Sequence, residues 1–376
     1  MYCNGKNEHY IDIACPFGKT NSPLEFCPPV TLFAKSAAIR YAQTKDCERP
    51  RLGTHVDDIF GGFENCPSYN RALAFRNYLC NTGKSLTVKF NMKVKKTPLP
   101  ATNQIILGCM WDSKSKRVRT SPDKRIKYLG RIKELLGNPA TSVKILEKIH
   151  GNLSYAAEVT PFGRPFLAPL ITPTIGRQAK DVVTLPPLAK VGLRIWSKIL
   201  SANRGSSFAF ILNDLPRAKN AIFVDASTQW GVGGCYGTAF FSFHWRTLQR
   251  FVNIDYIARM ELLACIIALS VFGEMVKDKL VTIYCDNSNV VTWLRKGRSS
   301  NMLGTRLLSC WELEKYKLRC KTQPKWLPSD HNVTADSLSR GRIPDHLAQR
   351  GTRHYCNLRN VGHAIKHPEK SWDSIL

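Results

Sequence analysis

Residues 221–245 read AIFVDASTQWGVGGCYGTAFFSFHW, and this stretch decides the fold of the chain's second half. It holds three short strand-like runs, at 221–226, 230–236 and 239–245, of which the second is rich in Gly, with tight turns between them. Runs of this kind predict strands, and connections this short predict antiparallel neighbours. The stretch therefore predicts a three-stranded antiparallel unit.

Downstream of that unit, helical and strand-like patterns alternate. A long helix with one apolar stripe is predicted at 255–276, and a strand without charges follows at 281–285. Two helical segments are predicted at 289–296 and 303–316, a strand at 318–327, and a last helix from 332 onwards. Together with the three antiparallel strands, this order predicts a mixed α/β fold, in which helices flank a mixed sheet.

The first half of the chain is punctuated by Pro and Gly. The patterns predict a strand at 52–56, paired strands within 84–111 that include runs at 85–90 and 104–111, helices at 123–136, 142–157 and 188–202, and a proline-rich connector at 161–187. Because 376 residues exceed one typical core, more than one domain is expected.

The charge balance predicts a polyanionic partner. The chain carries 55 Lys and Arg against 28 Asp and Glu, a net charge of +27. Between residues 84 and 150 there are 16 basic and 4 acidic residues, which suits a surface that tracks nucleic-acid phosphates. A surface kept basic for solubility, or a ribosome-like or membrane-surface role, is the alternative. The candidate phosphate contacts are Lys93, Lys95, Lys96, Arg117 and Arg119.

Thirteen cysteines without a C-x-x-C pair argue against a disulfide framework and a zinc ribbon. They favour an intracellular setting, either cytoplasmic or nuclear. No targeting segment is visible, and the longest apolar stretch, 262–272, is too short to span a bilayer, so no membrane partner is expected. The tail residues His354, Cys356, His363 and His367 have no recognised metal-ligand spacing, so they are expected to be loose tail residues.

Four carboxylates fall at the ends of the predicted elements. Asp225 ends the first strand, Glu261 opens the long helix, Asp286 follows the strand at 281–285, and Asp336 begins the last helix. The ends of neighbouring central strands lie side by side, so these four acids are expected to converge. Such a set can hold two divalent ions about 4 Å apart for phosphodiester cleavage. For any one acid alone, a helix cap or a surface charge is the better interpretation.

Residues 218–341 resemble the ribonuclease H domain of retroelement polyproteins. The matching motifs are Phe223-Val-Asp225-Ala-Ser, Glu261-Leu-Leu-Ala, Tyr284-Cys-Asp286-Asn and Trp326-Leu-Pro-Ser-Asp-His-Asn332-Val-Thr-Ala-Asp336-Ser-Leu-Ser-Arg340. The resemblance implies that Asp225, Glu261, Asp286 and Asp336 bind two Mg²⁺ or Mn²⁺ ions. It places Ser227 and Asn287 near an RNA–DNA hybrid. Relatives carry a histidine before the last aspartate, but His331 is not in register with it.

The upstream half resembles the reverse transcriptase of the same elements. The motifs are Asn4-Gly-Lys-Asn-Glu-His-Tyr10, Cys15-Pro-Phe-Gly18, Ser22-Pro23, His55-Val-Asp57-Asp58, Ile106-Leu-Gly-Cys109 as a primer-gripping turn, and 151–170 as the end of the thumb. The sequences of these motifs favour the tyrosine-recombinase (DIRS-like) group of retrotransposons. The family's third polymerase aspartate would precede Met1, and Asp12 stands too close to Pro16 to replace it. Asp57 and Asp58 are therefore expected to be a polymerase remnant that does not polymerise alone.

This resemblance implies five segments and one leading activity. The segments are a partial palm at 1–112, a thumb-like helical region at 113–170, a connector at 171–217, a ribonuclease H-like domain at 218–341 and a basic tail at 342–376. The leading hypothesis is a ribonuclease H that cuts the RNA of RNA–DNA hybrids. The alternatives are a non-catalytic nucleic-acid-binding remnant and a fragment of a longer polymerase. The sequence makes no prediction of oligomeric state.

Overall fold

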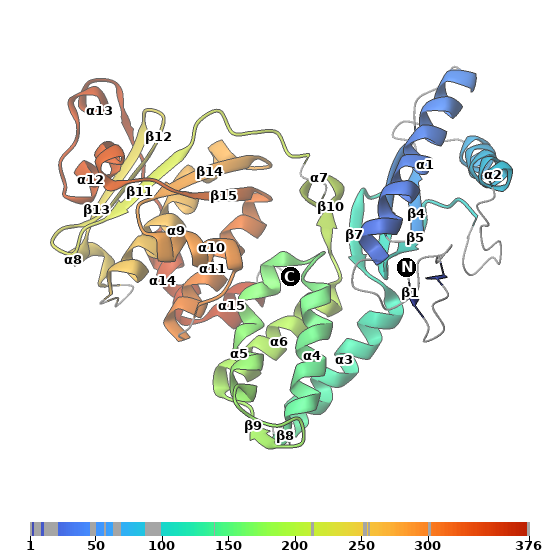
Figure 1. Ribbon diagram of the computed structural model, residues 1–376. Coiled ribbons are helices and arrows are strands. Elements are labelled where there is room, and N and C mark those ends of the chain that lie inside the picture. The colour runs from blue at the N-terminus through green and yellow to red at the C-terminus, as the bar shows by residue number, and fades with distance from the viewer. Residues whose placement is uncertain are drawn as a thin grey trace. The chain divides into compact units, whose positions relative to one another are not determined.

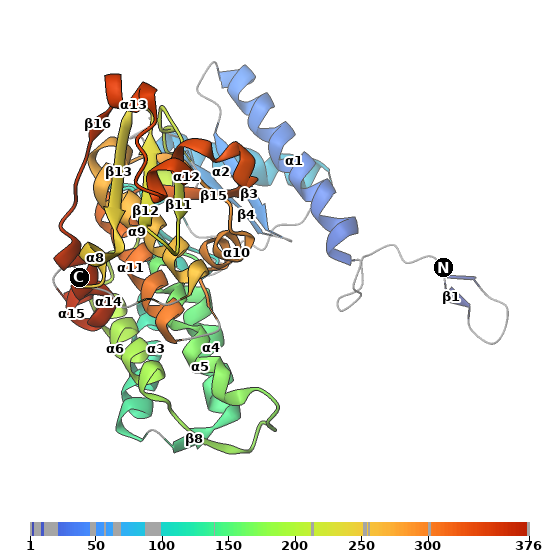
Figure 2. The ribbon, with the colours of Figure 1, turned by 90° about the vertical axis from the view of Figure 1, so that its left-hand side faces the viewer.

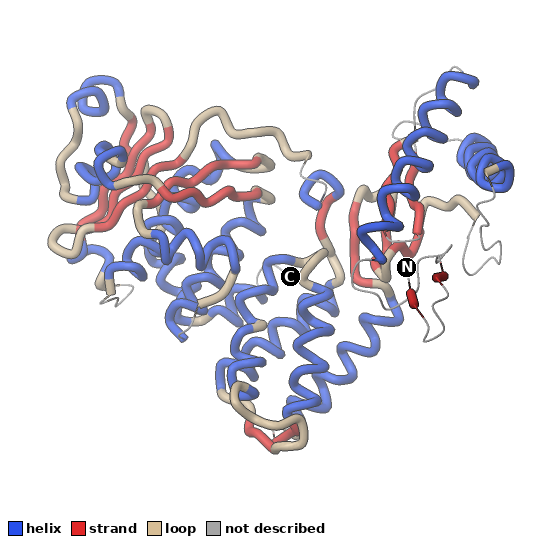
Figure 3. The backbone as a smooth tube through the Cα atoms, in the orientation of Figure 1, coloured by secondary structure: helices blue, strands red, loops and turns tan. Residues whose placement is uncertain are grey.

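The computed structural model describes residues 2–3, 9–10, 22–45, 50–55, 58–62, 69–86, 99–138, 140–211, 214–250, 254, 256–299 and 302–373. The chain divides into two compact units, Met1–Ile106 and Leu107–Leu376. The division falls six residues before the boundary that the sequence suggests at 112. Figure 1 labels the elements, and Figure 3 distinguishes the helices from the strands.

The first unit combines short strands with two helices. Its elements are β1 (Tyr2–Cys3), β2 (His9–Tyr10), α1 (Ser22–Lys45), β3 (Arg51–His55), β4 (Asp58–Gly62), α2 (Tyr69–Ser85) and β5 (Asn103–Ile106). Strands β3 and β4 form an antiparallel hairpin in which His55 pairs with Asp58. Tyr41 of α1 packs against Phe75 of α2 in a small core. The sequence patterns missed both helices, and Ser85, expected to start a strand, ends α2.

The second unit starts with a hairpin and a set of helices. In chain order these are β6 (Cys109–Asp112), β7 (Arg117–Thr120), α3 (Pro122–Gly137), β8 (Ala140–Ser142), α4 (Val143–Ala156), the 3₁₀ helix η1 (Pro161–Phe166), α5 (Ala168–Ile171), η2 (Thr172–Thr174), β9 (Val182–Thr184), α6 (Pro187–Ala202), β10 (Ser206–Ser207) and α7 (Phe208–Ile211). The helices predicted at 123–136, 142–157 and 188–202 are confirmed. The single run expected at 104–111 is instead broken by a turn at Leu107 and Gly108, both with positive φ.

A six-stranded mixed sheet dominates the rest of the unit. Its elements are β11 (Ile222–Ala226), β12 (Gly231–Tyr236), β13 (Ala239–His244), α8 (Trp245–Leu248), α9 (Ile257–Val276), β14 (Leu280–Cys285), α10 (Ser288–Lys296), α11 (Met302–Leu318), β15 (Lys321–Trp326), η3 (Ser329–His331), α12 (Val333–Ser339), α13 (Asp345–Arg350), β16 (Thr352–Arg353), α14 (Leu358–Lys366) and α15 (Pro368–Asp373).

The strand order is β15-β14-β11-β12-β13-β16. Strands β11, β12 and β13 are antiparallel, whereas β14 lies parallel to β11 and β15 parallel to β14. The predicted fold class is therefore confirmed as mixed α/β, with a mixed sheet flanked by helices.

Helices cover both faces of this sheet, as Figures 1 and 2 show. Alternate residues of β11 point to opposite faces, so Val224 enters the main core whereas Phe223 packs on a smaller cluster with Leu338 of α12. Helix α9 lies on the main-core face, and 13 of its residues are buried, including Leu262 and Ile266. Such a helix has little solvent-facing surface, which fits its near-continuous apolar sequence.

The described part of the tail, residues 342–373, is folded, and the expectation of loose tail residues is wrong for this segment. Strand β16 joins the sheet edge beside β13. Trp372 of α15 is fully buried, stacks with Phe162 of η1 and donates a hydrogen bond from Nε1 to Ser309 Oγ at 3.2 Å. The tail therefore joins the helical part of the unit to the sheet-bearing part. None of the described helices is long and apolar enough to cross a membrane.

Candidate metal centre

Asp225 lies near the end of β11, at the centre of the sheet. Its side chain is on the α12 face, and Asp225 is only 5% exposed. Ser339, the last residue of α12, donates a hydrogen bond from Oγ to Asp225 Oδ2 at 2.5 Å. The strand end thus fixes the carboxylate, and a helix residue 114 positions away orients it.

Glu261 lies in the second turn of α9, on the opposite face of the sheet, and is 3% exposed. Its Oε1 accepts a hydrogen bond from the backbone N–H of Ala226 at 3.2 Å. Its Oε2 accepts one from the thiol of Cys285 at 3.7 Å. Both carboxylate oxygens are held, so Glu261 has a defined orientation towards the ends of β11 and β14.

Asp286 directly follows β14, the parallel neighbour of β11. Ser329 Oγ donates a hydrogen bond to Asp286 Oδ2 at 2.7 Å, and Trp326 Nε1 donates to the Asp286 backbone carbonyl at 2.8 Å. Both donors come from the segment at the end of β15, so this segment, which follows the strand next to β14, fixes the position of Asp286.

Asp336 lies in the first turn of α12. Arg340, one turn further on, forms an ion pair with it, in which Nη2 and Nε donate to Oδ1 at 2.8 and 3.0 Å and Nε also donates to Oδ2 at 3.1 Å. Asn332, just before the helix, donates from Nδ2 to the backbone carbonyl of Val224 at 2.9 Å. That bond ties the start of α12 to β11 and so brings Asp336 towards Asp225.

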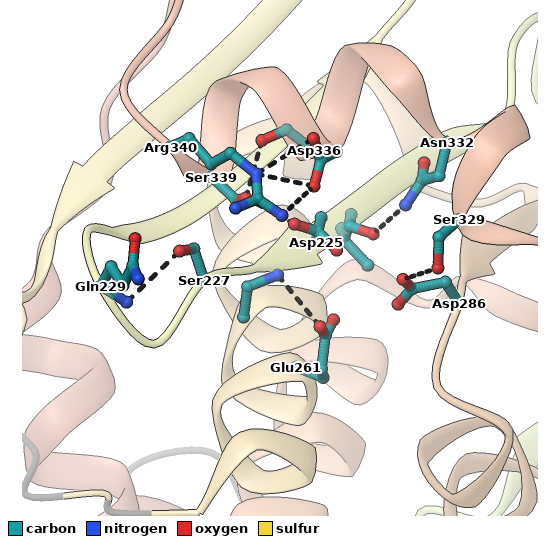
Figure 4. Close-up of polar contacts among 12 residues, drawn as sticks. Asp225, Ser227, Gln229, Glu261, Asp286, Ser329, Asn332, Asp336, Ser339 and Arg340 are labelled. Carbon is teal, nitrogen blue, oxygen red and sulfur yellow. Dashed lines mark hydrogen bonds and ion pairs between the residues drawn. The ribbon is translucent and has the colours of Figure 1, made fainter.

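Figure 4 shows the four carboxylates together, with Asp225 between Asp336 and Glu261 and with Asp286 beside them. Burial raises the pKa of Asp225 to about 6, aided by the charges of Asp286 and Asp336 and opposed by the Ser339 hydrogen bond and Arg340. Burial, with contributions from Cys285, Asp225 and Asp286, holds the pKa of Glu261 well above its usual range. Bringing these acids together without a cation is therefore unfavourable.

The donor chemistry of this cluster fits a hard divalent cation. Carboxylate oxygens are the ligands that Mg²⁺ and Mn²⁺ prefer. Among the described residues, Glu261, Cys285 and Asp286 form a group of potential metal ligands. One ligand atom from each of the three lies within 4.8 Å of the others. A hydrogen bond with Cys265 and burial hold the pKa of the Cys285 thiol well above its usual range. Cys285 therefore donates to Glu261 as a neutral thiol, which leaves the carboxylate oxygens as the candidate ligands.

Four residues of this centre were not predicted: Ser329, Ser339, Arg340 and Cys285. The first three stand inside the motif at 326–340, where their spacing from Asp336 was the available signal. Cys285 adjoins Asp286, but strand alternation sends adjacent side chains to opposite faces, which hid its contact with Glu261.

Ser227 and Asn287, expected near a hybrid, have structural contacts. The Ser227 hydroxyl accepts from the backbone N–H of Gln229, and its carbonyl accepts from Trp245 Nε1 at 2.6 Å. Asn287 caps α10, where its Oδ1 accepts from the backbone N–H of Asn289 at 3.1 Å. His331 is exposed in η3. Hybrid contacts by Ser227 and Asn287 stay predictions.

The remaining predicted contact residues lie away from the carboxylates or cannot be placed. Arg119 pairs with Asp112 at 3.1 Å, and Arg117 donates from Nε to the Arg204 carbonyl at 2.7 Å. Both line an open hollow together with Arg125 and Arg204. Asp58 begins β4. Asp57, Lys93, Lys95 and Lys96 lie outside the described residues, as do Asp12 and the Cys15–Gly18 motif.

Gly233 of β12 lets α12 approach the sheet closely enough to place Asp336. A Cβ there would lie 2.3 Å from the backbone nitrogen of Ser339. We expect Gly233→Ala to lower the free energy of unfolding by about 1–3 kcal/mol, because backbone must shift to admit the methyl group. Urea denaturation measures this loss. Gly130→Ala in α3, where a Cβ meets nothing within 4 Å, is the control. An equal effect of both changes would contradict the close-approach explanation.

No protein-family model matches the chain. None of the curated proteins compared with it matches either. Among solved structures, the chain is similar to a foamy viral protease-reverse transcriptase dRH in complex with ds DNA, with a TM-score of 0.39 and 13% sequence identity. The match covers 82% of this chain and 50% of the viral one, so the chain spans about half the length of that protein.

Proposed function

We propose that this protein is a metal-dependent ribonuclease H, which cuts the RNA strand of RNA–DNA hybrids. The observation that carries the proposal is the convergence of Asp225, Glu261, Asp286 and Asp336 at one end of the central strands. Four mutually repelling acids destabilise a fold, so a cluster of this kind is better explained by function than by stability.

The residues of the cluster would have different roles. Glu261 forms the buried floor, and Ser339 and Ser329 orient Asp225 and Asp286 from either side. Asp286 and Asp336 are only partly buried, so this side of the cluster is open to a substrate. Bound Mg²⁺ or Mn²⁺ would supply Lewis acidity for hydrolysis of the phosphodiester.

The substrate class follows from the charge of the chain and from the sequence motifs. A net charge of +27 favours nucleic-acid backbone, and Arg117 and Arg119 present guanidinium groups at a basic hollow in the same unit. Discrimination of RNA from DNA would come from contacts with 2′-hydroxyl groups. From the motifs we also propose a retroelement origin, leaning to the tyrosine-recombinase (DIRS-like) group, and an intracellular site of action.

The decisive experiment incubates the full chain with a hybrid whose RNA strand is end-labelled, in Mg²⁺ or Mn²⁺. We expect endonucleolytic RNA products, no cleavage of the DNA strand, and loss of activity in EDTA. Asp286→Asn should remove the activity, because the amide offers no anionic ligand. Asp330→Asn, an exposed neighbour in η3, is the matched control and should cut normally.

Two outcomes would contradict the proposal. Equal cleavage by Asp286→Asn would place the chemistry elsewhere. Tight binding of the hybrid without cleavage in either metal would favour the alternative, a non-catalytic nucleic-acid-binding protein.

A further inference from the structure

Arg340 is a positively charged side chain built into the acidic cluster. It contacts both oxygens of Asp336, at 3.0 and 3.1 Å from Nε and 2.8 Å from Nη2. Its charge also acts on Asp225, where it opposes the rise in pKa that burial causes. One guanidinium group thus balances part of the charge of two of the four carboxylates.

This ion pair and the proposed metal site need the same atoms. Nε and Nη2 of Arg340 together donate to both oxygens of Asp336, and an oxygen so occupied is a poorer ligand for a cation. Yet the pair is partly open to solvent, with side-chain exposures of 48% for Arg340 and 39% for Asp336. Ion pairs this exposed contribute little to stability, so this pair can be broken at low cost.

Once it is released, the Arg340 guanidinium remains beside the carboxylates on the exposed end of α12. A planar group with several donors suits bidentate contact with a phosphate. The phosphates of a hybrid lying over the cluster would therefore offer Arg340 a replacement for Asp336.

We propose that Arg340 is a positioning residue that exchanges partners, pairing with Asp336 in the metal-free protein and with a backbone phosphate of the hybrid in the loaded one. The proposal rests on the proposed function for the identity of the hybrid. Its first half, competition with a divalent cation for Asp336, does not depend on any cleavage.

The test compares wild type with Arg340→Gln, Arg340→Lys and Arg342→Gln, which removes an equal charge two residues away. Binding of Mn²⁺ to the protein without nucleic acid is measured by calorimetry. Arg340→Gln should lower the dissociation constant about two- to fivefold, the size of an exposed ion pair. Arg342→Gln should leave it unchanged, and Arg340→Lys should lie between the two.

Hybrid binding is then measured in Ca²⁺ by fluorescence anisotropy over a range of salt. Arg340→Gln should weaken binding about fivefold or more, and should reduce the salt slope by about one phosphate contact. Arg340→Lys should restore most of the affinity. In steady-state cleavage, the KM should rise while kcat stays within about threefold of wild type.

Equal Mn²⁺ affinity of Arg340→Gln and wild type would overturn the proposal, as would an equal shift in Arg342→Gln, since that would show a general field effect. A fall in kcat at constant KM would also overturn it. If wild type binds Mn²⁺ and hybrid but never cuts, and Arg340→Gln still shifts both affinities, the nuclease assignment fails while the exchange of partners stands.

Discussion

Replacing Asp225 with Asn should abolish cleavage of hybrid RNA and at the same time stabilise the metal-free protein. Even residues that merely orient metal ligands are typically worth 10- to 100-fold in affinity or activity, so loss of a central ligand should cost more than about a hundredfold. The amide keeps the shape of the carboxylate and can still accept the hydrogen bond from Ser339.

The gain in stability follows from the pKa of Asp225, which rises from 3.8 to about 6 on folding. A raised pKa means that the folded state prefers the protonated acid. Its favourable contribution is complete below pH 3.8 and is lost as the pH rises through 6. Glu261 shifts in the same direction. The metal-free wild type should therefore lose stability between about pH 4 and pH 6, and Asp225→Asn should lose less.

Urea unfolding in EDTA at pH 5 and pH 8 measures the effect. A shift of about two pKa units corresponds to roughly 3 kcal/mol at most, so Asp225→Asn should be more stable than wild type by about 1–3 kcal/mol at pH 8. The difference should shrink at pH 5. Asp330→Asn, which changes an exposed acid in η3, should show neither change. Destabilisation by Asp225→Asn at pH 8 would mean that burial and the neighbouring carboxylates do not disfavour the charged form of Asp225 as described.

Two central strands of the sheet were predictable from the sequence because each is an apolar run that leads to an acid. Asp225 stands near the end of β11, and Asp286 directly follows β14. Helix α9 was equally clear from its length and its apolar stripe. The order of the elements also indicated which strand ends would lie next to each other.

Long-range contacts could not be predicted from local patterns. Helix α1 was missed because it contains prolines and has no distinct apolar face, so its position depends on Tyr41 packing against Phe75 of α2. In the tail, Leu358, Val361 and Ile365 form a helical apolar stripe, but the short helix α14 is bounded by polar residues and lies in a basic segment. Its burial depends on α9 and α11, which lie far away in the sequence.

Trp372 lies at the contact between the tail, the helical part of the second unit and the sheet-bearing part. Its ring packs on Phe162 of η1 and Tyr316 of α11, with ring centroids 5.4 and 5.8 Å away. Nearby, Glu369 of α15 lies 3.8 Å from Arg194 and 3.7 Å from Lys198 on α6. These ion pairs are partly exposed and contribute little, so the buried indole provides most of the stabilisation of this contact.

Trp372→Ala should therefore lower the free energy of unfolding by about 3–5 kcal/mol, because it removes a large buried ring and leaves Ser309 without its indole donor. Urea denaturation of the full chain gives this value, and limited proteolysis should show earlier cleavage after residue 341. Tyr355→Ala removes a mostly exposed aromatic ring from the same tail and should cost under about 1 kcal/mol. If Trp372→Ala costs no more than this control, the tail is only peripherally attached, and the helical and sheet-bearing parts do not depend on it for their contact.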